Sequence, residues 1–312
     1  MSRKKRTLLI LLVALLGVGL FAYPIVSNYL FVRNASTVAE DYDRAVENAG
    51  EEALVGALEE ALIYNENLEG DPAHDPFLKG SGMVLGENYK TILDLDDSGA
   101  MGYLTIPKIG VKLSIYHGTA ESTLQRGIGH LEGSSLPVGG PGTHCVVTGH
   151  TGLAHAKMFT DLIKLGEGDL FYLHVLGETL AYRVDKIRKV EPENIEDLRR
   201  FPGEDYCTLV TCTPYGVNSH RLLVRGARTE YIPEEHEQAI RESRPAAVQW
   251  WYGGKTLAIG LAAGVAAALA ILLVMILKKR REKRWAENRL SRQNRQKRYW
   301  WEEEGGQNRS PS

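Results

Sequence analysis

The stretch "TLVTCTPYGVNSHRLLVRGAR", residues 208–228, predicts two β-strands joined by a tight turn. Strand-forming residues lie on both sides of "TPYG", and within it Pro214 and Gly216 favour a turn. Cys212 ends the first strand, while His220 and Arg221 begin the second. A hairpin at this position therefore brings a thiol close to cationic side chains at one end of a sheet.

The rest of residues 100–230 is rich in short β-prone runs separated by Gly and Pro. Together with the hairpin, the runs are "GYLTIP", "LSIYHG", "GIGHLEG", "HCVVTGH", "DLFYLHV", "LAYRVDKIRKV", "CTLVTCT" and "HRLLVRGAR". Eight strands at this spacing predict a mainly β domain that forms a closed or nearly closed barrel. Short helices are expected at residues 121–125, 158–163 and 194–199.

A helical region, residues 30–82, is expected before the barrel. Apolar residues recur at helical spacing among carboxylates from residue 36 to 68, which predicts one or two amphipathic helices. Residues 69–82, "EGDPAHDPFLKGSG", contain two Asp-Pro steps and form a loop, which by composition alone is an ordinary linker between helices and barrel. Residues 231–255, rich in Glu and Arg, are expected to be a linker after the barrel.

Two uncharged apolar segments, residues 7–23 and 256–277, are each long enough to cross a bilayer. Basic residues flank both on the outer side, in residues 1–6 and 278–312, and the positive-inside rule places such flanks in the cytoplasm. We therefore expect a two-span cell-membrane protein with cytoplasmic termini and an extracellular domain. A cleavable signal peptide is the alternative for the first segment, where we favour an uncleaved anchor.

The net charge of −2 hides an uneven distribution, because the basic residues gather at the two ends and leave the extracellular part acidic. This pattern argues against nucleic-acid binding. The three cysteines, Cys145, Cys207 and Cys212, are an odd number in an oxidising exterior, so at least one thiol stays free. Cys145 and Cys207 fit small buried strand residues, with a disulfide between them as the less favoured alternative. A structural role is also the default interpretation of Cys212 alone.

A cysteine nucleophile needs a proton-handling partner and a group that stabilises the oxyanion. Among the nine histidines, His150 stands out because "VVTGH" places it at the end of a strand, like Cys212. His155 and His220 are the next candidates for the base. Arg221 is suited to favour the thiolate and to stabilise developing negative charge. Neither zinc-ligand spacing nor a C-x-x-C motif occurs, so we expect no metal and no cofactor.

Taken together, these segments resemble the sortases, cysteine transpeptidases of the Gram-positive cell surface. The T-L-x-T-C block with its following Arg, and "TGH" about sixty residues upstream, carry the resemblance. It implies a sortase-type eight-stranded barrel with short helices. It also implies that Cys212 is the nucleophile, His150 the general acid/base and Arg221 the oxyanion stabiliser, whereas Arg225 is structural.

Two features make the sequence similar to class C, the sortases that polymerise pilins: a second, C-terminal span and a lid before the barrel. The lid is matched by "DPF", Asp75, Pro76 and Phe77. The resemblance implies that Asp75 faces Arg221 and that the ring of Phe77 covers Cys212. The preceding Asp71-Pro72 leaves open which aspartate pairs with the arginine.

The resemblance implies a membrane-anchored enzyme that cleaves an LPXTG-like sorting signal and joins pilin subunits through isopeptide bonds to an acceptor lysine. Its partners are then pilins and the cell membrane. One alternative is a sortase that anchors single proteins to cell-wall peptidoglycan. A second is a non-catalytic, membrane-anchored binding barrel in which Cys212 is structural. The identity of the pilin, the resting protonation of Cys212 and His150, and the oligomeric state stay open.

Overall fold

The computed structural model describes residues 3–68, 88–153, 155–242, 274, 276–296 and 299. The chain divides into two units. The larger comprises Ala22–Trp251, and the smaller comprises Met1–Phe21 with Tyr252–Ser312. The predicted lid, including Asp71, Asp75, Pro76 and Phe77, lies outside the described residues, as does nearly all of the predicted second span.

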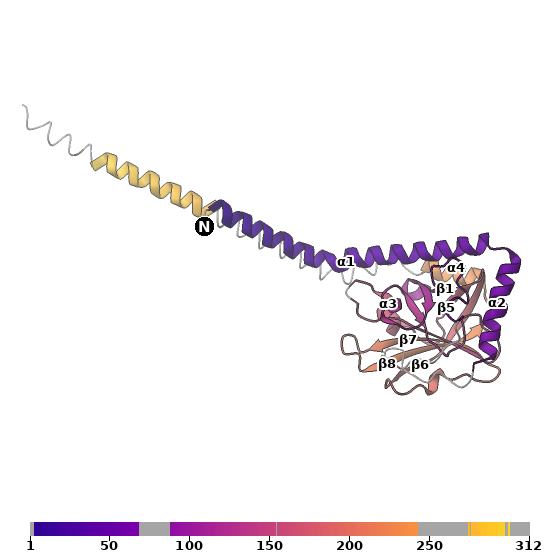
Figure 1. Cartoon of the computed structure of the whole chain (residues 1–312). Helices are drawn as coiled ribbons and strands as arrows, with labels where there is room; N and C mark the ends of the chain where they lie inside the picture. Colours follow the sequence, from indigo (N-terminus) through magenta and orange to yellow (C-terminus); the bar gives the residue numbers. More distant parts are fainter. Residues whose placement is uncertain are drawn as a thin grey trace, which may run out of the picture. The chain divides into compact units, whose positions relative to one another are not determined.

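The described residues contain eight strands that close into a barrel in the order β1-β2-β3-β4-β7-β8-β6-β5 (Figure 1). The strands are β1 (Ala100–Ile106), β2 (Val111–His117), β3 (Ile128–His130), β4 (Thr143–Thr148), β5 (Leu170–Val175), β6 (Glu178–Val190), β7 (Asp205–Thr213) and β8 (His220–Thr229). Each of the eight predicted runs supplies one strand. The prediction of a closed, mainly β barrel is confirmed.

Two of the strand pairs, β2 with β3 and β4 with β7, are parallel, and the other pairs are antiparallel. Parallel neighbours need a crossover rather than a hairpin. The connection between β2 and β3 carries α3 (Glu121–Leu124), and that between β4 and β7 carries η2 (Met158–Lys164) and η3 (Glu196–Leu198). The three short helices therefore occur where the sequence predicted them.

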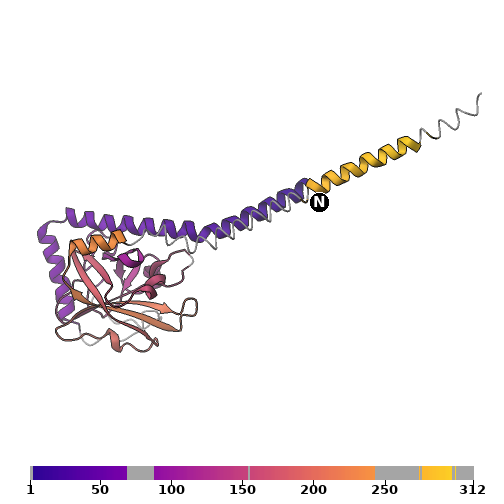
Figure 2. The same ribbon diagram turned by 180° about the vertical axis from the view of Figure 1, so that it is seen from behind.

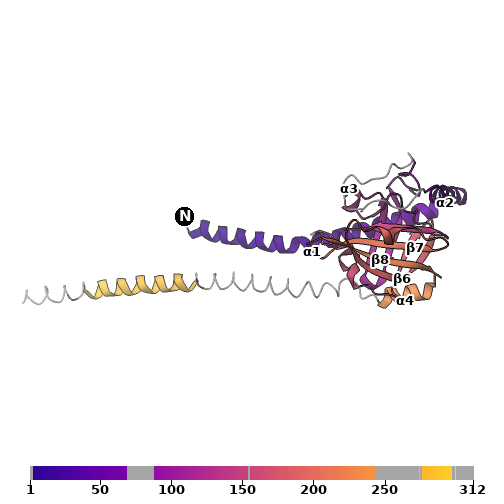
Figure 3. The same ribbon diagram turned by 90° about the horizontal axis from the view of Figure 1, so that it is seen from below.

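β8 lies between β6 and β7, so that the hairpin quoted first is paired on both sides (Figure 3). Apolar side chains of the strands fill the interior of the barrel, for example the stacked rings of Phe171 in β5 and Tyr182 in β6, 5.6 Å apart between centroids. Burial of this kind is the main favourable contribution to folding. The ends of β7 and β8 are thus supported by a packed core.

The helical region consists of α1 (Arg3–Asn48) and α2 (Glu51–Glu66). The later part of α1 contacts the barrel, where the hydroxyl of Tyr42 donates to the carbonyl of Met101 at 3.2 Å and accepts from the amide of Leu176 at 3.1 Å. α2 lies beside the barrel (Figure 1) and carries the buried Asn65. The carboxamide oxygen of Asn65 accepts from the amide of Leu136 at 2.7 Å, which fixes α2 to a barrel loop.

Among the residues that the structure describes, one helix, Leu15–Asn48, is long and apolar enough to cross a membrane. None of the residues in its 18-residue apolar stretch is buried, so the fold does not cover this part of the helix. An apolar helical stretch whose side chains the fold leaves exposed is suited to lipid. On length and composition alone, this helix overlaps the later part of the first predicted span, residues 7–23.

The structure differs from the predicted linker 231–255 in one respect, because Pro233–Glu242 form the helix α4. Proline at the first helical position and two acidic residues in the first turn, Glu234 and Glu235, favour a helix start there. The buried His236 of α4 packs on Tyr172 of β5, with ring centroids 3.9 Å apart. Figure 2 shows the orange α4 lying against the strands of the barrel. This part of the segment is therefore docked on the barrel.

Candidate active site

Cys212 and Arg221 are direct partners in the antiparallel β7–β8 ladder. Directly opposed residues in such a ladder project their side chains from the same face of the sheet. Cys212 is half-buried, whereas the Arg221 side chain is buried with only 7% of its surface exposed. The strand register therefore places the thiol beside a guanidinium that is largely shielded from water.

The turn between the two strands orients that guanidinium. It contains a cis Thr213–Pro214 peptide bond and two residues with positive φ, Gly216 at 74° and Asn218 at 59°. The Nη1 group of Arg221 donates to the carbonyl of Asn218 at 3.1 Å and to that of His220 at 3.3 Å. Asn218 is among the residue types that tolerate the left-handed conformation, which turns its carbonyl toward the guanidinium.

His150 reaches the same end of the barrel from β4. The parallel β4–β7 register pairs Thr148 with Val210, and two residues further along each chain stand His150 and Cys212. The amide of Gly149 donates to the carbonyl of Val210 at 3.1 Å, and the hydroxyl of Thr211 donates to the carbonyl of Gly149 at 2.7 Å. These bonds extend the pairing past the strand end, so His150 lies level with Cys212.

Gly149 is required immediately before His150. A Cβ atom at this position would lie 2.9 Å from side-chain atoms of both Ile128 and Phe159, closer than real Cβ contacts come. The amide of Phe159, at the start of η2, donates to the carbonyl of His150 at 3.1 Å. The backbone that presents the imidazole is therefore both tightly packed and hydrogen-bonded by the start of η2.

A carboxylate that the sequence did not single out also faces the imidazole. Nε2 of His150 lies 3.5 Å from Oε1 of Glu121, the first residue of α3. The imidazole side chain is 18% exposed and the glutamate 62%. No local motif marks Glu121, because the contact depends on the tertiary packing of α3 beside the end of β4.

Three other histidines, His130, His144 and His174, are structural. Burial lowers the pKa of His130 and His144 to about 4 and that of His174 to about 3, so all three are neutral at physiological pH. The ring nitrogens of His144, for example, lie 2.6 Å from the carbonyl of Arg199 and 2.7 Å from the hydroxyl of Thr208. Such buried, hydrogen-bonded rings stabilise the barrel.

The two runners-up for the base lie in other contacts. The ring of His155 packs edge-on against Phe31 of α1, with centroids 6.4 Å apart. His220 pairs with Thr213 in the β7–β8 ladder, and its Nδ1 lies 2.8 Å from the hydroxyl of its neighbour Ser219. These contacts favour His150 as the imidazole that works with Cys212.

Cys145 and Cys207 are directly opposed in the β4–β7 pair, and both are buried, free thiols. Burial, followed by the hydrogen bond with Cys145, raises the pKa of the Cys207 thiol well above its usual range. A protonated thiol without access to water is a poor nucleophile. The two cysteines thus behave as core residues, and the disulfide alternative does not match the structure.

Arg225 forms a separate ion pair. Its Nε donates to Oδ1 of Asp185 at 3.1 Å and its Nη2 to Oδ2 at 2.5 Å, while the guanidinium lies 4.1 Å above the centre of the Tyr206 ring. A bidentate pair of this kind fixes β8 against β6. These contacts agree with the structural role expected for Arg225.

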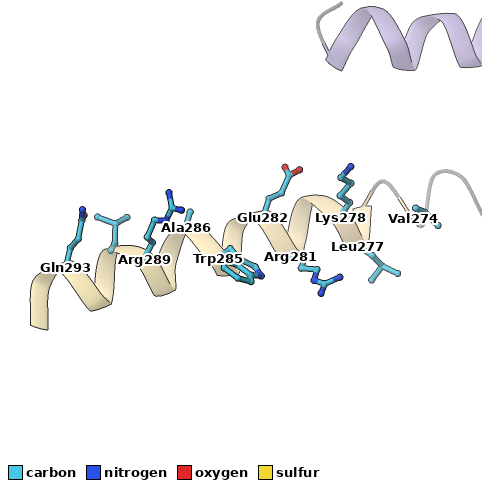
Figure 4. A pocket seen from close by; sticks show the side chains of 10 residues that line it. Val274, Leu277, Lys278, Arg281, Glu282, Trp285, Ala286, Arg289 and Gln293 are labelled. Atoms are coloured by element: carbon cyan, nitrogen blue, oxygen red, sulfur yellow. The ribbon is translucent and has the colours of Figure 1, made fainter. Parts of the chain in front are cut away.

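The remaining features of the described residues add no second catalytic centre. No group of three His, Cys, Asp or Glu side chains in those residues is arranged to hold a metal ion. Figure 4 shows a hollow along the C-terminal helical residues, with basic and apolar side chains. It is lined by Val274, Leu277, Lys278, Arg281, Glu282, Trp285, Ala286, Arg289, Leu290 and Gln293. This set lacks a nucleophile and an imidazole.

Comparison with known proteins agrees with this geometry. The sortase domain matches residues 104–229, which include all three candidate catalytic residues. The crystal structure of sortase C-1 from Actinomyces oris is 50% identical, with a TM-score of 0.55, and the match covers 58% of this chain and 99% of that one. The sortase C structure from Streptococcus pneumoniae is 44% identical, with a TM-score of 0.58, covering 62% and 97%.

Among curated proteins, sortase A of Staphylococcus aureus is 27% identical over 205 residues, which are 64% of this chain and 82% of the relative. A barrel that presents a thiol at the end of one strand, flanked by an arginine and a histidine on the neighbouring strands, is the arrangement of a cysteine transpeptidase. The chain belongs to the sortase family. Within that family it is a class C sortase, since its solved relatives at 42–50% identity are class C enzymes.

Proposed function

We propose that this sortase is a membrane-anchored pilin polymerase, which cleaves an LPXTG-like sorting signal and joins pilin subunits through lysine isopeptide bonds. The observation that carries the proposal is the pairing of Cys212 with Arg221, level with His150, in a class C barrel. Two of the similar enzymes support it, since the S. pneumoniae sortase C is described in terms of pilin substrate specificity and a Group B Streptococcus sortase C as pilus-related.

In the first half-reaction, with the thiol proton of Cys212 held by His150, the thiolate Sγ attacks the carbonyl carbon between Thr and Gly of the sorting signal. The new S–C bond gives a tetrahedral intermediate whose oxyanion accepts hydrogen bonds from Arg221. The C–N bond then breaks, and His150 donates a proton to the leaving glycine amine. The products are a thioacyl enzyme and the released C-terminal part of the pilin.

In the second half-reaction, the neutral ε-amine of a lysine on the next pilin attacks the thioacyl carbon. His150 takes the proton that the amine loses, and the C–S bond breaks to release the thiolate of Cys212. The product is an isopeptide bond between two subunits, and the site returns to its starting state. No cofactor or metal takes part in either step.

We place the enzyme in the membrane through two spans, residues 7–23 and 256–277, with the barrel outside and both termini in the cytoplasm. The apolar helix within α1 and the basic flanks of both segments support this topology. Tethering keeps the barrel close to membrane-held pilins and raises their effective concentration at the site.

We further propose that residues 69–82 act as a lid in which Asp75 pairs with Arg221 and Phe77 covers Cys212. The chain on both sides of this segment is attached to the barrel. Nη2 of Arg200 donates to the carbonyl of Leu68 at 2.8 Å, and the hydroxyl of Tyr89 contacts Nδ1 of the buried His130 at 2.8 Å. Opening then requires movement between two fixed ends.

The lid proposal predicts that Phe77→Ala or Asp75→Ala speeds alkylation of Cys212 by a thiol reagent at least about threefold, because the closed state shields the thiol. The rate is measured by mass spectrometry of the modified protein under pseudo-first-order conditions. Asp71→Ala is the matched control, and an effect there instead would transfer the pairing role to Asp71. Unchanged rates in all three variants would exclude the lid.

The proposed reaction predicts covalent ladders when the enzyme is incubated with a pilin that carries a sorting signal. Ladder bands that resist boiling in detergent are expected, and mass spectrometry of the tryptic digest should find a threonine carboxyl joined to a lysine ε-amine. Transfer to a peptidoglycan stem-peptide amine instead would favour the anchoring alternative. Absence of any thioacyl adduct with an LPXTG peptide would favour a binding barrel.

A further inference from the structure

The proposed mechanism assigns no role to Glu121, although its carboxylate lies against the ring of His150. Nε2 of His150 is buried and lies 3.5 Å from Oε1 of Glu121, the distance of an ion pair rather than of a short hydrogen bond. The Glu121 side chain is mostly exposed, so the carboxylate stays accessible to solvent while its Oε1 faces the ring.

The fold keeps α3 in place beside the histidine. Leu124 of α3 is buried, and its Cδ2 lies 3.1 Å from the position of a Cβ on Gly129 in β3. Gly129 pairs with Thr148 of β4, two residues before His150. The carboxylate is oriented in turn by Gln125, whose amide donates to Oε1 of Glu121. The short helix is thus packed onto the strands that present the imidazole.

From this geometry we propose that Glu121 is a positioning residue for His150, one that fixes the ring orientation and stabilises the imidazolium. A neutral imidazole has one N–H, and a carboxylate at Nε2 favours the tautomer that carries the proton there. Nδ1 is then the nitrogen that exchanges protons with the amines. A carboxylate that orients a catalytic histidine in this way also stabilises the cation formed when the ring takes a proton.

The inference rests on the proposed roles of Cys212 and His150 and adds a third group to them. Among the described residues, Glu121 from α3, Cys212 from β7, and Arg221 and His220 from β8 are titratable or charged groups at this end of the barrel. Arg221 opposes the imidazolium electrostatically, whereas Glu121 favours it. Loss of the carboxylate therefore lowers the population of the pair in which Cys212 is a thiolate and His150 a cation.

Glu121→Gln tests this, because glutamine keeps the size and an acceptor oxygen but lacks the charge. We expect kcat for transfer of an LPXTG peptide to an amine to fall about three- to tenfold at neutral pH, with KM little changed. The alkaline limb of the pH–rate profile should be displaced relative to that of the wild type. Glu121→Asp should recover part of the rate, and the exposed Glu167→Gln is the matched control.

A second readout, the pH dependence of Cys212 alkylation by iodoacetamide, does not require transfer. Glu121→Gln should slow alkylation at neutral pH by a similar factor. If the wild-type enzyme forms no thioacyl adduct, the proposed function fails, and alkylation still tests the role of Glu121. The inference would be overturned if Glu121→Gln and wild type gave superimposable alkylation and pH–rate profiles. It would also be overturned if the rate fell while the shape of the pH–rate profile stayed the same, because that result indicates a merely structural role.

Discussion

Cys212→Ala is expected to abolish transpeptidation, with a loss of at least about 10³-fold in kcat and no thioacyl adduct in the mass spectrum. Alanine leaves the barrel intact, because Cys212 is half-buried at the end of β7 and has no disulfide. The variant should still bind a sorting-signal peptide, since the side chains around the thiol are unchanged. Initial rates of peptide transfer and ladder formation with a pilin both measure the effect.

Cys207→Ala is the control for this experiment. It removes a thiol from a strand position five residues away that is fully buried and paired with Cys145. The lost sulfur leaves a small cavity, for which we expect a decrease of roughly 1 kcal/mol in the free energy of unfolding. Ladders should still form below the melting transition. Polymerisation by Cys212→Ala would show that the nucleophile has been assigned wrongly.

Arg221→Ala is expected to lower kcat by about 10²–10³-fold while KM changes little, because the lost hydrogen bonds act on the oxyanion of the transition state. Arg221→Lys should recover only a small part of this rate. The Nη1 group donates to the carbonyls of Asn218 and His220, which holds the planar guanidinium in one orientation. A single ammonium group cannot reproduce that geometry.

The matched control is Arg225→Lys, four residues further along β8. Lysine keeps a charge for Asp185 but loses the bidentate geometry and the contact with the Tyr206 ring. The variant should melt at a lower temperature and retain most of its kcat. A value of kcat for Arg221→Ala within about threefold of wild type would remove Arg221 from the transition state.

The barrel and the thiol–arginine pair were predictable because they depend on local order. Alternation and turn residues define the hairpin of residues 208–228. Its short connection restricts the register of the two strands, so that Cys212 and Arg221 are expected to be neighbours. His150 was found through its place after a strand, since strand ends that carry function gather at one end of a barrel. The sequence could not show that β4 runs parallel beside β7, because that pairing joins residues 62 positions apart.

Glu121 and α4 were missed for related reasons. The approach of Glu121 to His150 depends on how Leu124 packs on Gly129, and the spacing of residues along the sequence does not indicate that contact. The charged composition of residues 233–242 resembles a solvated linker, yet its His236 is buried against Tyr172 of the barrel. Amphipathic helices of about ten residues are difficult to separate from linkers in acidic sequences.

The parallel pairing of β4 with β7 has a consequence for how this enzyme can vary. His150 and Cys212 project from neighbouring strands that run in the same direction, so their alignment is set by the single residue, Gly149 or Thr211, between each side chain and the last paired position. The loops that connect η2, β5, β6 and η3 lie between them in the chain and can lengthen or shorten without altering that alignment. One added residue between Thr148 and His150, in contrast, would turn the imidazole to the opposite face. Variation in length is therefore free to accumulate in the loops of the long crossover, while the three-residue segments at the two strand ends stay fixed in length.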